Sequence, residues 1–177
     1  MTAVVWRIAM EAPAYAANDL SGMGARLTGG RWNSKGTPVV YCAVNIALAA
    51  LEMVHYLKGR GPFNRYLVRI EIPDEVWTTC QVLAPLPGGW DAVPAGLSSI
   101  AAGDAWIASG ASALLRVPSV IVPDEDNVLI NPQHPDTAAM TATTIGAGSD
   151  QHGRCASSGN NGRWTLNISF MIVGGSL

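Results

Sequence analysis

Charge is scarce in this chain of 177 residues, in which 11 basic and 13 acidic side chains give a net charge of −2. No basic run occurs, so the chain lacks the electrostatic footprint of a protein that binds nucleic-acid phosphates. No apolar run approaches the roughly 20 residues that span a bilayer, and Arg7 and Glu11 interrupt the N-terminal segment where a secretory signal needs an apolar core. We therefore expect no direct nucleic-acid binding, no membrane insertion and a cytoplasmic location.

Cysteine is also rare. Cys42, Cys80 and Cys155 are odd in number and lack any CxxC spacing, so neither a disulfide framework nor a zinc site is indicated. We expect buried thiols and no metal. What the chain has in quantity is apolar residues, 49 % of the total, which suffice for the core of a single domain.

The apolar pattern predicts several strands and two or three helices. Segments rich in β-branched and aromatic residues are expected to be strands: 3–9, 37–43, 65–73, 76–83, 113–122 and 127–131. Helices are expected over 45–58, with Asn45 as N-cap, and over 97–110, ending at Gly110; residues 18–30 are expected to be a loop. Because several strands follow one another without a helix between them, we predict an α+β fold with a single mixed sheet.

The composition changes near residue 141. Residues 141–177 are rich in Gly, Ser, Asn and Thr and contain a single acidic residue, Asp150. We interpret residues 1–140 as the domain and 141–177 as an atypical tail. Our hypothesis for the tail is a C-terminus altered by a change of reading frame, which sequencing of the DNA around codon 141 tests.

Three polar residues of different chemistry occur in and after the stretch GGRWNSKGTPVVYC, residues 29–42. Arg31 follows two glycines, and a guanidinium binds phosphate oxygens bidentately where glycines let the backbone approach. Tyr41 offers an aromatic face and Glu52, within the expected helix, a carboxylate. Taken singly, these residues have commoner explanations: a solvated turn arginine, a core tyrosine and a glutamate on the wet face of a helix.

Three segments together resemble the RES domain: the N-terminal WRIA, GGRWNSKGTPVVYCAVNIALAALE, and GDAWIASGASALLRVPSVIVPDEDNVLINPQHPD. The resemblance covers residues 4 to about 139. This family of toxins is named for an arginine, a glutamate and a serine, which the resemblance places at Arg31, Glu52 and Ser119, with Tyr41 in the YCA stretch. It implies a fold similar to that of ADP-ribosyltransferases, with NAD⁺ as substrate and no further cofactor.

The resemblance also implies roles for individual residues and a partner. Arg31, Tyr41, Glu52 and Ser119 are expected to be catalytic. The residues expected to bind NAD⁺ are Arg31, Tyr41, Arg7 and Asn131. An Xre-type helix-turn-helix antitoxin is the expected partner, and a homodimer within the toxin–antitoxin complex is left open. From the residues alone, Arg7 is equally consistent with an ion pair, and turn chemistry explains Asn127, Asn131 and His134.

The chemistry of NAD⁺ cleavage is consistent with this set. Breaking the nicotinamide–ribose bond releases a neutral leaving group and develops positive charge on the ribose, so the site must bind pyrophosphate, hold the ring and place negative or dipolar groups beside the sugar. Ser119 could hydrogen-bond the ribose or the carboxamide. In ADP-ribosyltransferases of the diphtheria type, two spaced tyrosines sandwich nicotinamide and a glutamate lies on a later strand. Here Glu52 falls at the second tyrosine's spacing from Tyr41, so its role as catalytic carboxylate or as a substitute for that tyrosine stays open.

The expected function is therefore a toxin that depletes cellular NAD⁺ and arrests growth, as a glycohydrolase or by phosphorolysis. ADP-ribosylation of a protein target and a non-catalytic, partner-binding module are the alternatives. The acceptor of the ADP-ribose, whether water, phosphate or a protein side chain, is left open.

Overall fold

The computed structural model describes residues 2–57 and 65–145. Its strands are β1 (Thr2–Met10), β2 (Val40–Ala43), β3 (Arg65–Pro73), β4 (Gln81–Val82), β5 (Leu114–Pro118), β6 (Asp126–Ile130) and β7 (Thr141–Ile145). Its helices are α1 (Met23–Thr28), α2 (Ile46–Leu57), α3 (Asp74–Trp77), α4 (Leu97–Ser109) and a 3₁₀ turn, η1 (Pro135–Ala139). Cys155 and the rest of the tail beyond residue 145 lie outside the described residues. The hypothesis about the origin of the tail therefore concerns residues that lie mostly outside the described ones.

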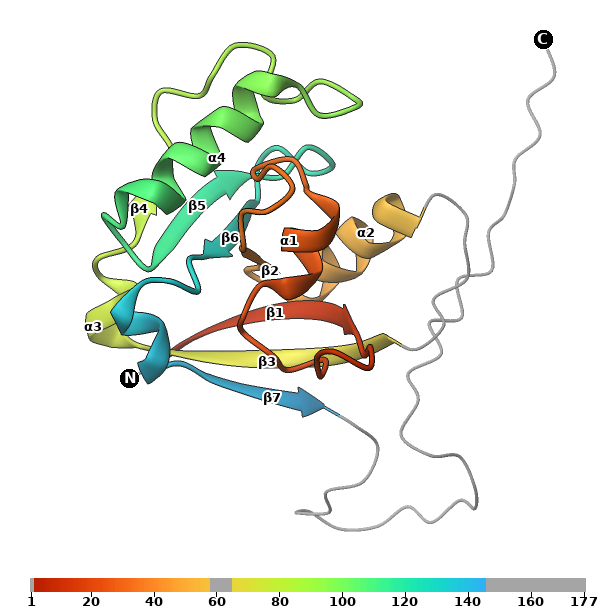
Figure 1. Cartoon of the computed structure of the whole chain (residues 1–177), viewed down its shortest axis with the longest axis vertical. Helices are drawn as coiled ribbons and strands as arrows, with labels where there is room; N and C mark the ends of the chain where they lie inside the picture. The colour runs from red at the N-terminus through yellow and green to blue at the C-terminus, as the bar shows by residue number, and fades with distance from the viewer. Residues whose placement is uncertain (1, 58–64, 146–177) are drawn as a thin grey trace, which may run out of the picture.

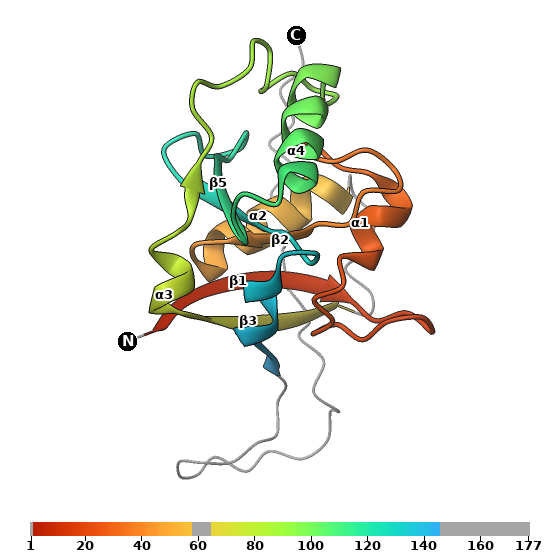
Figure 2. The ribbon, with the colours of Figure 1, turned by 60° about the vertical axis from the view of Figure 1, so that its left-hand side comes forward.

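The seven strands form one mixed sheet in the order β4-β5-β6-β2-β1-β3-β7. Neighbouring strands are antiparallel except β4 and β5. β1 and β2 are joined by a single residue pair, Trp6 with Ala43, so the sheet consists of two halves (Figures 1 and 2). One half contains β1, β3 and β7; the other contains β2, β6, β5 and β4. The prediction of an α+β fold with a mixed sheet is confirmed.

Side chains alternate across the strands and build a separate core on each face of the sheet. On one face, Val5, Val40 and Ile130 belong to a buried cluster that includes Val76 of α3 and Met140 after η1. On the other face, Trp6 and Ala43 pack with Leu48 and Ala49 of α2. Tyr41, Leu115 and Leu129 pack on this second face with Trp106 and Ile107 of α4. The helices α2 and α4 thus cover the same face, and that face carries the candidate site.

The strands predicted over 3–9 and 65–73 are confirmed as β1 and β3, and the helices predicted over 45–58 and 97–110 as α2 and α4. The side chain of Asn45 caps α2, because its Oδ1 accepts a hydrogen bond from the Leu48 amide at 2.8 Å. α4 ends at Gly110, whose φ of 58° is the left-handed conformation that glycine tolerates.

Three local predictions are wrong. Residues 76–83 form the end of α3 and the two-residue β4 rather than one strand, and residues 18–30 contain α1. The strand expected over 113–122 ends at Pro118, because the Ser119 hydroxyl accepts hydrogen bonds from the amides of Ile121 and Val122 and turns the chain. At the far edge of the sheet, β7 pairs with β3 over residues 141–145.

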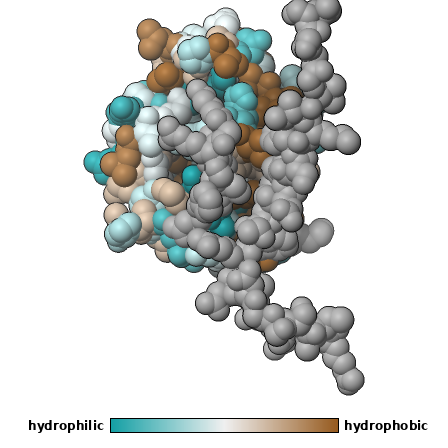
Figure 3. Space-filling model, turned by 90° about the vertical axis from the view of Figure 1, so that its right-hand side faces the viewer, coloured by the Kyte–Doolittle hydropathy of each residue, from teal (hydrophilic) through white to brown (hydrophobic). Residues whose placement is uncertain are grey.

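The surface is mixed in polarity. On α2, Ile46 and Leu51 are exposed apolar residues. Figure 3 shows the side of the molecule nearest α2, where apolar areas lie between polar ones. Among the helices of residues 2–57 and 65–145, none is long and apolar enough to cross a membrane.

Candidate active site

The loop that carries Arg31 is held in place by Tyr41 and Asn33. The Tyr41 hydroxyl donates to Asn33 Oδ1 at 2.8 Å and accepts from the Trp32 amide at 2.9 Å. Asn33 is 1 % exposed, and its Nδ2 donates to backbone carbonyls of the surrounding chain, those of Ala25, Ser34 and Thr37. Burial raises the pKa of Tyr41 above its ordinary value, so the hydroxyl stays neutral and its hydrogen bonds serve the loop.

The local structure explains why glycine occupies both positions before Arg31. A Cβ on Gly30 would lie 2.6 Å from the Tyr41 hydroxyl oxygen, so only glycine leaves room for that hydroxyl. Gly29 has a φ of 72°, which favours glycine. These contacts account for the glycine pair without the close approach to phosphate that the sequence suggested.

α4 forms the other support of this loop. A Cβ on Gly103 would lie 1.9 Å from the Trp32 carbonyl oxygen, so the helix and the loop are in backbone contact. Asp104, the next residue on the helix, accepts a hydrogen bond from the Ser34 amide at 2.9 Å. The position of Arg31 therefore depends on α4 as well as on β2.

Arg31 binds the loop between β4 and α4. Its Nη1 donates to the carbonyl oxygens of Trp90 at 2.7 Å and Ala92 at 2.8 Å. Trp90 also stacks on Trp32, with ring centroids 6.3 Å apart and planes 17° from parallel. No described residue accepts from Nε or Nη2 of Arg31, so this edge of the guanidinium remains available for a ligand.

Glu52 projects from α2 toward the ends of two strands. One of its oxygens, Oε1, accepts hydrogen bonds from Ser119 Oγ at 2.8 Å and from Asn127 Nδ2 at 2.6 Å. Ser119 is 0 % exposed, and the same hydroxyl accepts from the amides of Ile121 and Val122, each at 3.1 Å. A hydroxyl has one donor and two acceptor positions, so that of Ser119 is fully occupied and acts only through Glu52.

These groups line a small cleft of about 60 Å³. Its walls are Arg31, Trp32, Tyr41, Glu52, Pro118, Val120 and Asn127. Of the residues predicted to be catalytic, Arg31, Tyr41 and Glu52 line the cleft and Ser119 lies directly behind Glu52. Within the part of the chain that the structure describes, no group of three or more His, Cys, Asp or Glu residues is arranged to hold a metal ion.

The comparison with known families matches this chain to the RES domain over residues 4–156. The chain belongs to the RES domain family. A protein of Sphingobium sp. strain YBL2 named Prs ADP-ribosylating toxin is 55 % identical over 148 residues, which are 82 % of this chain and 92 % of the relative. A protein named Toxin Res from Yersinia enterocolitica is 36 % identical, over 74 % of this chain and 85 % of the relative. Another protein named Toxin Res, from Pseudomonas putida, is 39 % identical over 75 % of this chain and 86 % of the relative.

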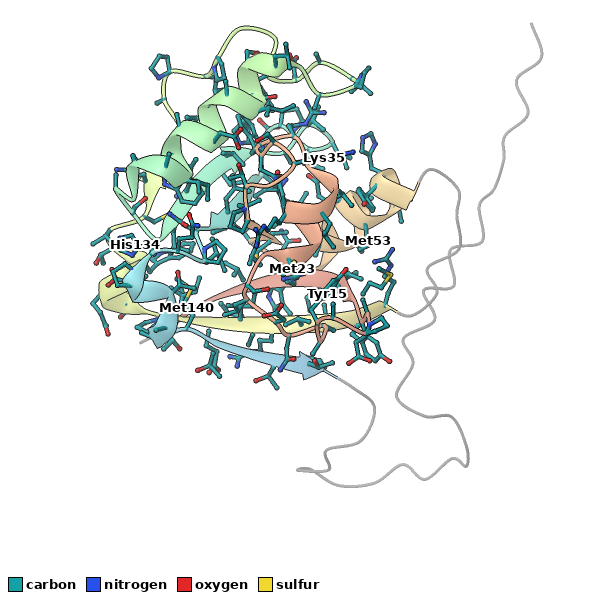
Figure 4. All side chains as sticks on the ribbon, in the orientation of Figure 1. Tyr15, Met23, Lys35, Met53, His134 and Met140 are labelled. Atoms are coloured by element: carbon teal, nitrogen blue, oxygen red, sulfur yellow. The ribbon has the colours of Figure 1, made fainter. Side chains whose placement is uncertain are left out.

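Two residues predicted to bind NAD⁺ lie away from the cleft of this RES domain. Arg7 is on the opposite face of the sheet, where its Nη1 donates to the Asp19 carbonyl at 3.3 Å. Burial lowers its pKa, while Cys42, Asp19 and Tyr15 act in the opposite direction. Figure 4 shows Tyr15 well below Lys35, which belongs to the Arg31 loop. The structure thus does not bring Arg7 together with Arg31 and Glu52.

Asn131, the other predicted binding residue, is 1 % exposed and follows β6. Its Nδ2 donates to the Ile107 carbonyl at 3.3 Å, and its Oδ1 accepts from the Gln133 amide at 3.0 Å. Both ends of the amide are therefore used to join β6 to α4 and to the turn that follows it. The residue does not line the cleft.

Two residues of this RES domain site, Asn127 and Trp32, were not among the predicted site residues. Asn127 was interpreted as a turn residue, but it lies in β6 opposite Ala43 and lines the cleft. No role in the site was predicted for Trp32, which forms part of the cleft wall and stacks on Trp90. The signal for Asn127 was a polar residue within an apolar strand segment. Its partner, Glu52, is 75 residues away in sequence, so only the fold reveals the contact.

Proposed function

We propose that this RES domain is a toxin that cleaves the nicotinamide–ribose bond of NAD⁺ and transfers the ADP-ribose to an acceptor. The observation that carries the proposal is Glu52, whose Oε1 is fixed by Ser119 and Asn127 at the wall of a cleft that also contains Arg31. No described residue donates to the second oxygen, Oε2. An oriented carboxylate with one oxygen left for the ligand suits a reaction that develops positive charge on a sugar.

Each wall of the cleft has a part in this reaction. The free edge of Arg31 would hold the pyrophosphate through paired hydrogen bonds. The ring of Tyr41 would pack against the nicotinamide, while its hydroxyl keeps the Arg31 loop in place. Glu52 would lie beside the ribose, and Ser119 would act as its positioning residue.

The bond changes are those of a substitution at the ribose C1′. The bond from C1′ to the nicotinamide nitrogen breaks, and its electron pair leaves with the neutral nicotinamide. Positive charge then spreads over C1′ and the ring oxygen, where the carboxylate of Glu52 stabilises it. The acceptor forms the new bond to C1′ and loses its proton to solvent. Strong acid catalysis is not needed, because the leaving group departs neutral.

The chemistry at C1′ does not by itself select the acceptor, since water, phosphate and a protein side chain can all attack this carbon. The name of the Sphingobium relative, Prs ADP-ribosylating toxin, supports a protein acceptor, Prs, at 55 % identity over most of both chains. Transfer to water or phosphate would instead deplete NAD⁺ without marking a protein. A partner of the Xre helix-turn-helix type, which would hold the toxin in check in the cytoplasm, completes the proposal.

Mass analysis of products tests the proposal. The purified chain is incubated with NAD⁺ alone, with added phosphate, and with purified Prs. We expect release of nicotinamide and a gain of one ADP-ribose on Prs; free ADP-ribose or its phosphate would assign the acceptor to water or phosphate. Glu52→Gln, which keeps the size of the side chain but removes its charge, should lower the rate by about 10²- to 10³-fold. Intact NAD⁺ in every mixture would contradict the proposal and favour a module that only binds a partner.

A further inference from the structure

The side-chain amide of Asn127 has an NH₂ group and a carbonyl oxygen, and only one of the two is engaged by a described residue, Glu52. A carboxylate only accepts hydrogen bonds, so the group that contacts Glu52 Oε1 at 2.6 Å must be the NH₂ group, Nδ2. This contact identifies the other terminal atom of the amide as the carbonyl oxygen, Oδ1. No described residue donates to Oδ1, and Asn127 lines the cleft.

Two neighbouring residues of the cleft wall, Glu52 and Asn127, therefore each keep one acceptor that no described residue engages, Oε2 and Oδ1. The hydrogen bond between Asn127 Nδ2 and Glu52 Oε1 keeps the two side chains next to each other. The cleft volume is only about 60 Å³, so the cleft admits small polar groups of a ligand. Two adjacent hydroxyl groups on one sugar would fill this space and donate to both acceptors.

We propose that Asn127 is a substrate-binding residue that accepts the 3′-hydroxyl of the nicotinamide ribose while its amide nitrogen holds Glu52. Glu52 takes the neighbouring 2′-hydroxyl, because the negative charge acts best closest to C1′, where positive charge develops. The pair thus recognises the cis-diol of the ribose. This assignment rests on the proposed function, since it takes NAD⁺ as the substrate.

The test compares NAD⁺ with an analogue that lacks only the 3′-hydroxyl of the nicotinamide ribose. For the wild-type chain we expect a kcat/KM about tenfold lower on the analogue, the worth of one hydrogen bond from a hydroxyl to a neutral acceptor. Asn127→Ala removes that acceptor, so it should consume both compounds at one reduced rate. Asn127→Asp keeps an acceptor oxygen but loses the donor to Glu52, so it should preserve the preference while its kcat falls.

Asn18→Ala is the matched control. Asn18 is exposed, and its Nδ2 donates to the Ala142 carbonyl at 3.3 Å, away from the cleft lining. This variant should keep both the wild-type rate and the wild-type preference. A residue that served only to support Glu52 would change the rate on both compounds equally and leave their ratio unchanged.

The outcomes separate this assignment from the function on which it depends. Equal consumption of both compounds by the wild type would overturn the assignment alone, and that comparison needs no variant to fold. A tenfold preference that persists in Asn127→Ala would also overturn it. If the wild type consumes no NAD⁺ with any acceptor, the proposed function fails and the assignment fails with it.

Discussion

At the scale of single residues, the site separates the groups that face the ligand from those that hold them. The Ser119 hydroxyl uses its one donor and two acceptor positions on neighbouring protein groups, and the Tyr41 hydroxyl both donates to and accepts from such groups. Glu52 and Asn127 each keep one oxygen that no described residue engages. Ser119 faces no ligand in this arrangement and instead holds the Glu52 carboxylate through a hydrogen bond.

Ser119→Ala should therefore impair catalysis without abolishing substrate binding. The change leaves Glu52 Oε1 with Asn127 as its remaining donor and deprives the Ile121 and Val122 amides of their acceptor. We expect a loss of about 1–3 kcal/mol in the free energy of unfolding, because these partly buried groups lose a hydrogen-bond partner, and a fall in kcat that exceeds the change in KM.

Urea unfolding and NAD⁺ consumption measure the two effects. Ser98→Ala is the matched control, because Ser98 is exposed and donates only to the Gly88 carbonyl. Unchanged kcat in Ser119→Ala would contradict a positioning role for the serine.

Tyr41→Phe removes a hydroxyl but keeps the ring. The Trp32 amide and Asn33 Oδ1 both lose a partner, so the Arg31 loop should loosen while the aromatic face of the cleft remains. We expect the free energy of unfolding to fall by about 1–3 kcal/mol and the KM for NAD⁺ to rise. Tyr56→Phe, at an exposed position on α2, serves as the control; equal stability of the two variants would argue against the loop's dependence on Tyr41.

At the scale of elements, the sequence predicted those that local patterning determines. The cap at Asn45 and the apolar spacing after it locate α2, and alternation locates β3. Local patterning failed over 76–83, where the chain forms α3 and a two-residue strand, because such short elements depend on tertiary contacts more than on propensity.

The residues of the candidate site also fall into those that the sequence predicted and those that only the fold reveals. Arg31, Tyr41 and Glu52 were predicted from a resemblance carried by contiguous motifs, and all three line the cleft. Asn127 was missed, because its role depends on the register that pairs β6 with β2. Arg7 illustrates the reverse case, since the alternation of β1 places it on the face opposite Trp6 and the site.

The contact between α4 and the Arg31 loop gives a prediction at this scale. Gly103→Ala would place a methyl group 1.9 Å from the Trp32 carbonyl oxygen, so the helix and the loop must separate. We expect a loss of about 1–3 kcal/mol in the free energy of unfolding, with weaker NAD⁺ binding because Arg31 moves with the loop. Gly88→Ala, where an added Cβ meets nothing within 4 Å, should leave both quantities unchanged. Calorimetry with the two variants decides the point, and a wild-type melting temperature for Gly103→Ala would refute it.

At the scale of the whole molecule, α2 links the two halves of the sheet. The strands of the two halves share one residue pair, Trp6 with Ala43, but Leu48 and Ala49 of α2 pack against residues from both. Glu52 projects from this helix, so the geometry of the cleft depends on the docking of the halves. Global stability and the shape of the site are therefore coupled.

Alkaline pH should weaken that global stability through Cys42. Burial raises the pKa of this thiol from 9.0 to about 12, although the Arg7 guanidinium nearby acts to lower it. Below pH 9 the thiol is neutral in both states, and its contribution is fully present. As the pH rises further, the unfolded chain releases the proton and the folded chain keeps it, so the free energy of unfolding falls by about 1.4 kcal/mol per pH unit.

Urea unfolding at intervals between pH 7 and pH 10 measures this slope. Cys42→Ala removes the thiol and should flatten the curve above pH 9, whatever the cavity costs at neutral pH, because the comparison concerns slopes. Cys80→Ala is the matched control: burial also raises the pKa of Cys80, to about 11, but this thiol is partly exposed and solvent screens its effect. Cys80→Ala should therefore keep most of the slope. Equal slopes for wild type and Cys42→Ala would show that another group governs the alkaline transition.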